Sequence, residues 1–208
     1  MNRNWIGPLC GVLFVVVAVV CFALTGEGKD PSENSAEEIA SYYQDNDTEN
    51  QLAAFLLGGA AILLLFFAGW LRSVLRAAEG EGGSLASVSF GALLVIAAGL
   101  SVGATIHLAL VDFVDDVDPT VTAAINTIDY SFFIPFAVGM SAFLLSLGIA
   151  AVRHGALPKW LGWAAIVLGI IAFTPAGFLG FLGGLVLIAV IGVIGIMRAR
   201  SEAPPATA

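Results

Sequence analysis

The sequence predicts an all-α, polytopic membrane protein with six transmembrane helices and a short extracytoplasmic helix between the first two. Three observations lead to this fold class. The 208 residues are 59% hydrophobic with a mean hydropathy of +0.95. Several charge-free apolar runs reach the length of about 18 residues that marks a membrane span. Lys and Arg also gather in alternate connecting loops. Residues 1–200 are predicted to form one transmembrane domain, with the segment 27–50 inserted as an outer cap and 201–208 as a disordered cytoplasmic tail.

The six predicted spans cover residues 5–24, 52–75, 85–111, 130–152, 158–173 and 175–197. The first run could instead be a secretory signal. Its apolar part, however, exceeds the usual core of about 7–15 residues, and no A-x-A-like cleavage site follows it. The last two spans form one apolar run about twice as long as a core of roughly 30 Å requires. That run must turn back, and Thr174-Pro175 followed by Gly177 is the predicted turn.

Charge predicts the orientation of these spans. Seven of the eight Lys and Arg residues lie at the termini or in the even-numbered loops, and thirteen of the sixteen Asp and Glu residues lie in or beside the odd-numbered loops. The positive-inside rule then places both termini in the cytoplasm of a multi-pass cell-membrane protein. The lipid bilayer is the required partner. Nucleic acid is excluded because phosphates need cationic contacts, whereas the outer face is acidic. A membrane-protein partner or a homo-oligomer stays open.

The polar segment after the first span predicts a short outer helix. Ser35 and Glu38 have the spacing of a capping box, and residues 36, 39, 40 and 43 form one apolar stripe at helical spacing. So short a helix is marginal in water, so Ile39 and Tyr43 are expected to pack on the outer ends of the bundle. Thr48 and Gln51 predict a second capping box at the start of span two. The helix could be a lid over a cavity or a structural plug, and both interpretations stay open.

Candidate site residues gather near the outer ends of spans three and four. His107 is the ionisable residue well inside a span, which makes it a functional hypothesis by default, although a satisfied interfacial group is the alternative. Asp112, Asp129 and Tyr130 lie at a similar level in the sequence, and His107 is expected to contact Asp129 directly or through one water. Asp118-Pro119 predicts the cap and first turn of a helix that leads toward Asp129.

Other sequence features predict packing rather than chemistry. No catalytic spacing, metal-ligand set or phosphate-binding loop occurs, so no catalytic residue, cofactor or metal is predicted. Pro135 is expected to kink or unwind span four. Small residues at close spacing are expected to pack helices within the chain; they are Gly58, Gly59, Gly99, Gly103, Gly139, Gly148, Gly180 and Gly184.

The stretch "RHGALPKWLGW", residues 153–163, reads as a cytoplasmic anchor turn. Arg153 and Lys159 would hold it in the cytoplasm, Pro158 would start the next helix, and Trp160 and Trp163 would lie at the interface. This motif, with "AEEIASYYQDN" and "LRSVLR", resembles small uncharacterised membrane proteins of bacteria grouped as a domain of unknown function. The resemblance implies six helices and a bacterial inner membrane. It implies no activity and no functional residues.

The sequence favours a non-enzymatic accessory or envelope protein, because nothing in it is typical of catalysis. The alternative is a small ion, proton or small-molecule transporter that uses the polar groups near the outer ends of spans three and four. A membrane enzyme is the third class, and it would need several polar residues at one depth.

Overall fold

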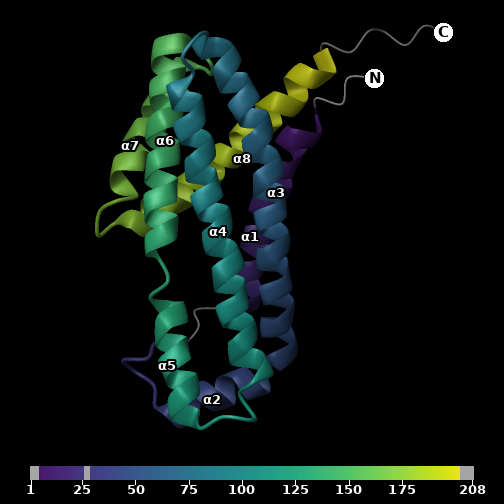
Figure 1. Ribbon diagram of the computed structural model, residues 1–208, viewed down its shortest axis with the longest axis vertical. Coiled ribbons are helices and arrows are strands. Elements are labelled where there is room, and N and C mark those ends of the chain that lie inside the picture. Colours follow the sequence, from purple (N-terminus) through teal and green to yellow (C-terminus); the bar gives the residue numbers. More distant parts are fainter. Residues whose placement is uncertain (1–4, 26–28, 202–208) are drawn as a thin grey trace, which may run out of the picture.

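The computed structural model of the chain describes residues 5–25 and 29–201, and these form a helical bundle without strands (Figure 1). The helices are α1 (Ile6–Thr25), α2 (Ala36–Asp45), α3 (Asp47–Glu79), α4 (Ser84–Asp112), α5 (Pro119–Tyr130), α6 (Ile134–His154), α7 (Lys159–Ile171) and α8 (Gly177–Ser201). The predicted tail lies outside the described residues except for Ser201, which ends α8. Residues 27 and 28 of the predicted cap segment also lie outside them.

Five stretches of the described chain are long and apolar enough to cross a bilayer: α1, α3, α4, α8 and Pro119–His154, which contains α5 and α6. The described chain is therefore helical, with several elements that have the length and apolar character of membrane spans, as its composition predicts. The sixth expected span is shorter than predicted. Helix α7 has 13 residues, or about 20 Å by helical rise, because the chain turns at 172–176. The turn itself lies where it was predicted, with the Gly177 N–H donating to the Thr174 carbonyl at 2.8 Å.

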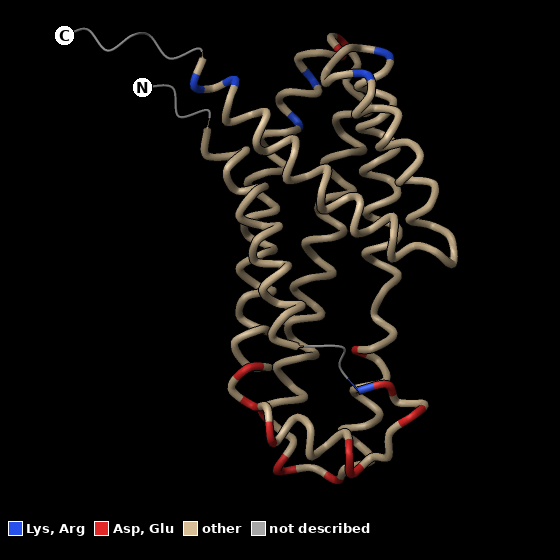
Figure 2. The backbone as a smooth tube through the Cα atoms, turned by 180° about the vertical axis from the view of Figure 1, so that it is seen from behind, with Lys and Arg blue, Asp and Glu red and all other residues tan. Residues whose placement is uncertain are grey.

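Charged side chains divide the bundle into a basic end and an acidic end (Figure 2). The basic end holds the C-terminal ends of α3, α6 and α8 and the starts of α1 and α7. The acidic end holds α2, α5 and the loop between α4 and α5, and Lys29 is the basic residue that the described chain contributes there.

Glycines allow close helix contacts in the half of the bundle nearer the basic end. A Cβ atom on Gly148 of α6 would stand 2.7 Å from the Gly162 carbonyl oxygen of α7, and one on Gly192 of α8 would stand 2.7 Å from the Pro8 carbonyl oxygen of α1. Backbones that approach so closely leave no room for a larger residue. The expectation of packing within the chain is wrong for Gly58 and Gly59, whose Cβ positions have no neighbour within 4 Å.

Two predicted helix boundaries differ from those of the structure. The chain breaks between α5 and α6 at residues 131–133, and Pro135 lies in the first turn of α6. The break thus precedes the proline. Proline is compatible with the first turn of a helix, because N–H groups at that position have no carbonyl of the same helix to bond. The second predicted capping box is also wrong. Helix α3 begins at Asp47, so Thr48 lies inside the helix and does not form a capping box with Gln51.

Helix α2 has the predicted capping box. Ser35 accepts a hydrogen bond from the Glu38 N–H, and the Glu38 carboxylate accepts one from the Ser35 N–H. Its apolar stripe is buried, with Ile39 and Tyr43 only 1% and 2% exposed. Both pack with Leu110, Val111 and Val114 at the end of α4. Because α2 closes the acidic end of the bundle, it forms one wall of the site described next.

Candidate functional site

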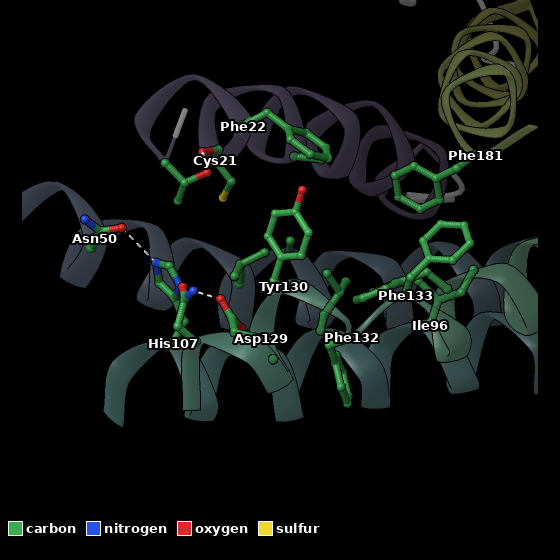
Figure 3. Close-up of a pocket in the computed structure, with 18 of the residues that line it drawn as sticks. Cys21, Phe22, Asn50, Ile96, His107, Asp129, Tyr130, Phe132, Phe133 and Phe181 are labelled. Carbon is green, nitrogen blue, oxygen red and sulfur yellow. Dashed lines mark hydrogen bonds and ion pairs between the residues drawn. The ribbon is translucent and has the colours of Figure 1, made fainter. Parts of the chain in front are cut away.

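A cavity of about 370 Å³ lies in the half of the bundle nearer the acidic end (Figure 3). Helices α1, α2, α3, α4, α5, α6 and α8 all contribute side chains to it. Its polar wall consists of Thr25, Lys29, Tyr42, Tyr43, Asn50, His107, Asn126, Asp129 and Tyr130. Its apolar wall includes Phe14, Phe22, Ile96, Leu100, Phe132, Phe133, Phe136, Phe178 and Phe181. A polar group at one end and aromatic rings at the other give the cavity an amphipathic lining.

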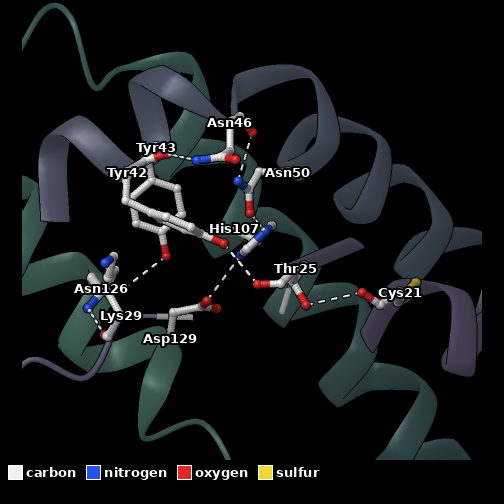
Figure 4. A network of polar contacts seen from close by, with 10 residues as sticks. All are labelled: Cys21, Thr25, Lys29, Tyr42, Tyr43, Asn46, Asn50, His107, Asn126 and Asp129. Atoms are coloured by element: carbon white, nitrogen blue, oxygen red, sulfur yellow. Dashed lines mark hydrogen bonds and ion pairs between the residues drawn. The ribbon is translucent and has the colours of Figure 1, made fainter. Parts of the chain in front are cut away.

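His107 is the centre of the polar wall (Figure 4). Its Nδ1 atom lies 3.1 Å from Oδ2 of Asp129 on α5, and its Nε2 atom lies 3.0 Å from Oδ1 of Asn50 on α3. The His107 residue is only 7% exposed. The contact between His107 and Asp129 that the sequence predicted is therefore present. Asn50, which the sequence did not single out, is the second partner.

The hydrogen bonds around Asn50 determine where the protons lie. The Asn50 side-chain amide donates to the Asn46 carbonyl at 2.7 Å, so its Oδ1 atom must accept from His107. Nε2 of His107 therefore carries a hydrogen. A neutral His107 with its hydrogen on Nε2 has none on Nδ1. Nδ1 and the oxygen of an ionised Asp129 would then both be acceptors. Their 3.1 Å contact is a hydrogen bond when one proton lies between the two atoms.

Tyrosines of α2 surround this pair. The Tyr43 ring meets the His107 ring edge-on at 6.0 Å between centroids, and its hydroxyl donates to Oδ1 of Asn126 at 2.8 Å. Burial, and in smaller part the charge of Asp129, raises the pKa of Tyr43, so the hydroxyl stays protonated as a donor. The Tyr42 hydroxyl donates to the Thr25 carbonyl at 2.8 Å. These bonds tie α2 to the end of α1 and to α5.

The apolar wall continues from the polar pair toward the middle of the bundle. Phe132, Phe136 and Phe181 form a chain of edge-to-face contacts with centroids 6.2 Å and 6.1 Å apart. Phe14 and Ile96, which lie near the midpoints of α1 and α4, also line the cavity. Aromatic rings present large apolar surfaces with little rotamer freedom to lose. This wall therefore suits an alkyl chain or a ring, not a hydrated ion.

The cavity opens sideways between helices. Phe22 on α1, Phe133 just before α6 and Phe178 on α8 line it and are also 49%, 38% and 56% exposed. No described Cα atom of α1 comes within 8 Å of a Cα atom of α4, α5 or α6. The backbones of α1 and α6 are thus separated on this side of the cavity. Since these helices are apolar and of membrane-spanning length, the opening would face lipid.

The structure separates the remaining predicted residues. Tyr130 lines the cavity, and its hydroxyl donates to Oδ2 of Asp30 at 3.2 Å. Asp112 does not line the cavity. It is exposed at the end of α4, where its Oδ1 atom lies 3.5 Å from Nε2 of Gln51. The anchor-turn residues Arg153, Pro158, Lys159, Trp160 and Trp163 lie at the opposite, basic end, where Pro158 caps α7.

Sequence reasoning missed Asn50, Asn126 and the phenylalanine wall. Asn50 lies four residues after Asn46, the residue that precedes α3, and this spacing lets the Asn50 amide donate to the Asn46 carbonyl, which was the available signal. The repeated Phe in residues 132–136 and 178–181 was a second signal. Among the described residues no three His, Cys, Asp or Glu side chains form a group that could hold a metal ion.

The sequence matches no model of a known protein family, no curated protein and no solved structure. The resemblance to bacterial proteins of unknown function therefore stays a prediction. The geometry of the cavity is the basis for assigning a function.

Proposed function

We propose that the protein spans the cell membrane with both termini in the cytoplasm and the acidic end outside. The separation of basic from acidic side chains supports this orientation. In this topology α7 and α8 form a hairpin that enters and returns from the cytoplasmic side. The chain then has six helices in the membrane, but α7 penetrates only part of it. Helices α2 and α5 form the extracytoplasmic cap.

Cysteine labelling tests this orientation with two matched loop positions. Asp116 and Glu81 are both exposed acidic residues, at opposite ends of the bundle. In variants with both native cysteines changed to Ser, Asp116→Cys should react with a membrane-impermeant maleimide on intact cells. Glu81→Cys should react only after permeabilisation. The reverse pattern would refute the topology.

Within that topology we propose that the protein binds a small amphipathic molecule taken from the outer leaflet, without chemically changing it. The observation that carries this proposal is the two-ended cavity, with the His107–Asp129–Asn50 cluster at one end and a phenyl-lined wall at the other. Its volume of about 370 Å³ is at the lower end of the roughly 300–1,000 Å³ typical of small-molecule sites.

The deep end of the cavity favours binding over ion conduction. Beyond Phe14 and Ile96 the bundle is filled by a core of fully buried side chains that includes Leu64, Met140 and Leu144. These residues offer no polar atoms that could replace the hydration shell of an ion. No continuous polar path leads from the His107 cluster to the basic end through the described residues of this core.

The two native cysteines provide a direct test of the cavity. Cys21 lines it, whereas Cys10 belongs to the packed core. In Cys10→Ser protein, where only Cys21 remains, membrane-soluble N-phenylmaleimide should react at a measurable rate. A single-chain amphiphile added to the bilayer should slow that reaction. In Cys21→Ser protein, Cys10 should stay unreactive. Equal reactivity of the two thiols, insensitive to every amphiphile, would refute the binding proposal.

Transport of the bound molecule is the second candidate, favoured by the contact between a histidine and a carboxyl group, His107 and Asp129, inside the cavity. It requires release of the ligand on the other side, so the packed core would have to open. Reconstituted vesicles provide the test. Accumulation driven by a pH gradient and lost in His107→Gln would support transport, whereas binding without accumulation would leave a binding protein.

A further inference from the structure

We infer that an anionic phospholipid binds at the basic end of the bundle, with its phosphate on Arg198 and part of an acyl chain in a groove between α3 and α8. This site is separate from the cavity near His107, so it goes beyond the proposed function. Three features of the described residues lead to it: the shape of the groove, the cation at its rim and the charges around that cation.

The groove is a second cavity, of about 280 Å³, between α3 and α8. On α3 it is lined by Trp70, Val74 and Ala77, which lie at positions i, i+4 and i+7 and so share one face of the helix. On α8 the lining runs at similar spacing from Ile191 to Arg198. No Cα atom of α3 comes within 8 Å of a Cα atom of α8. The two faces therefore stand apart and leave room between them.

Trp70 and Gly195 close the inner side of the groove. A Cβ atom on Gly195 would stand 2.7 Å from Cζ2 and Cη2 of Trp70, so the indole ring packs directly against the backbone of α8. Ile191, about one turn further in, is fully buried, whereas Ala77 and Arg198 are exposed. The groove is thus apolar inside and open at its rim, where Arg198 is the charged residue among those that line it.

Arg198 has no carboxylate partner in the part of the chain that the structure describes. The ion pair found among the described residues joins His107 to Asp129, and no Lys or Arg side chain of that part takes part in one. Glu79, at the same end, accepts a hydrogen bond from the Ala86 N–H at 3.0 Å in the connection between α3 and α4. A guanidinium is permanently charged, and its planar N–H donors match a phosphate group. An external anion is therefore the partner that this side chain lacks.

The charges around Arg198 favour a head group with a net negative charge. The described cationic residues of this end are Arg72, Arg76, Arg153, Lys159, Arg198 and Arg200, and its described carboxylates are those of Glu79 and Glu81 (Figure 2). A zwitterionic head group would add a cation to this excess, whereas phosphatidylglycerol brings the phosphate alone. Basic pockets between membrane helices bind anionic head groups in this way.

The apolar interior of the groove favours a lipid over a soluble phosphate. Both α3 and α8 have the length and apolar character of membrane spans, so the space between them would face acyl chains. Tryptophan is also typical of the level at which head groups meet those chains, and Trp70 lies there beside the groove. A phospholipid supplies both an anion for Arg198 and a chain for the faces below it.

Fluorescence quenching of Trp70 tests this site directly. In the full chain with Trp5, Trp160 and Trp163 changed to Phe, Trp70 is the remaining tryptophan, and bromine atoms on a lipid chain quench a tryptophan that they contact. In phosphatidylcholine nanodiscs, chain-brominated phosphatidylglycerol should reach half-maximal quenching at about a tenfold lower mole fraction than chain-brominated phosphatidylcholine. That ratio is expected for one hydrogen bond to a charged group.

Two arginine variants of this single-tryptophan protein locate the phosphate. Arg198→Gln should remove the preference for phosphatidylglycerol, because glutamine carries no charge. Arg200→Gln is the matched control, since it removes the same charge from the same last turn of α8 but from a residue outside the groove. It should keep the preference. Arg198→Lys should keep only part of it, because an ammonium lacks the planar set of donors.

Each contrary outcome overturns a defined part of the inference. Equal quenching by the two brominated lipids would overturn the anionic site, and equal losses in Arg198→Gln and Arg200→Gln would show general attraction to the basic end. Glycerol 3-phosphate, which has no chains, should leave the quenching unchanged, and full reversal by it would show a site for soluble phosphate. The reactivity of Cys21 in the other cavity should be the same in both variants, so the proposed function is tested independently.

Discussion

The two halves of the bundle are built from different side chains. Near the basic end, glycine and alanine let α1, α6, α7 and α8 pack backbone against backbone, and fully buried Leu64 and Leu144 fill what remains. Near the acidic end, large aromatic rings and hydrogen-bonded polar groups surround a cavity. Close packing holds the first half together without polar groups. The second half tolerates a cavity because directional hydrogen bonds fix its walls. The half near the basic end is thus the closely packed, rigid one, and the half near the acidic end contains the proposed binding cavity.

The largest effect should come from adding a phenyl ring to each half. Ala165 on α7 is fully buried, so Ala165→Phe forces backbones apart and should cost more than the roughly 1–3 kcal/mol of ordinary overpacking. Ala18→Phe places the same ring in the cavity and should leave the melting temperature nearly unchanged while protecting Cys21. Thermal unfolding in detergent and maleimide labelling measure the two effects. Similar melting temperatures for the two variants would contradict the contrast between the halves.

A smaller effect is expected from the apolar stripe of α2. Ile39→Ser removes burial worth about 1.5–3 kcal/mol for a large side chain, and should release α2 from the end of α4. Limited proteolysis of the outer segment should accelerate. Glu37→Gln, on the exposed side of the same helix, is the control and should change the cleavage rate little. Faster cleavage in the control than in Ile39→Ser would show that charge, and not packing, holds the cap.

The Asn50 variant should have a comparable or slightly smaller effect on stability. Asn50→Ala leaves Nε2 of His107 without its partner, while the Asn46 carbonyl keeps the Asn50 backbone N–H. An unsatisfied buried group costs about 1–3 kcal/mol. The loss should be seen as a lower melting temperature and weaker protection of Cys21 by ligand. Gln51→Ala, at the exposed neighbouring position, should change neither. An unaffected Asn50→Ala protein would mean that hydrogen bonds do not fix the walls of the cavity.

The smallest effect concerns pH at the α2 cap. Hydrogen bonds from the Ser35 backbone and side chain lower the pKa of Glu38 below its usual 4.5. A lowered folded-state pKa contributes stability that is present above the usual value and lost as pH falls through the folded one. Proteolysis of the outer segment by an acid-active protease should therefore accelerate only below pH 4.5. Glu38→Gln should abolish that acid response. A response at neutral pH would contradict this assignment.

Sequence patterns predicted the features that depend on composition and local spacing. The lengths of the apolar runs predicted the long helices, and the charge distribution predicted a basic and an acidic end of the bundle. The spacing of Ser35 and Glu38 predicted the capping box of α2. The contact between His107 and Asp129 was predictable because both residues lie at one level near the ends of their helices. Each of these inferences requires only knowing which residues form a helix and in which direction that helix runs.

The rest depends on how helices are rotated and how far they reach. Asp112 was expected near His107, but five residues turn an α-helix by about 140°, so the two side chains face different neighbours. Asn50 became a partner of His107 through the register of α3 against α4, which no local pattern encodes. The phenylalanine wall combines rings from residues 132–136 with rings from α8, and a correctly predicted turn at 174–177 does not show how these helices are rotated toward one another.

Because α7 is short, the thickness of the surrounding bilayer should affect access to the cavity. A helix of about 20 Å in a hydrocarbon core of roughly 30 Å leaves its turn surrounded by acyl chains, and each ångström of mismatch costs a fraction of a kcal/mol. Phe178 follows this turn and stands at the cavity opening. In the proposed orientation a thinner bilayer brings the outer head groups toward Phe178, whereas a thicker one covers the opening with chain termini. Lipid composition would thereby control how readily a head group reaches His107.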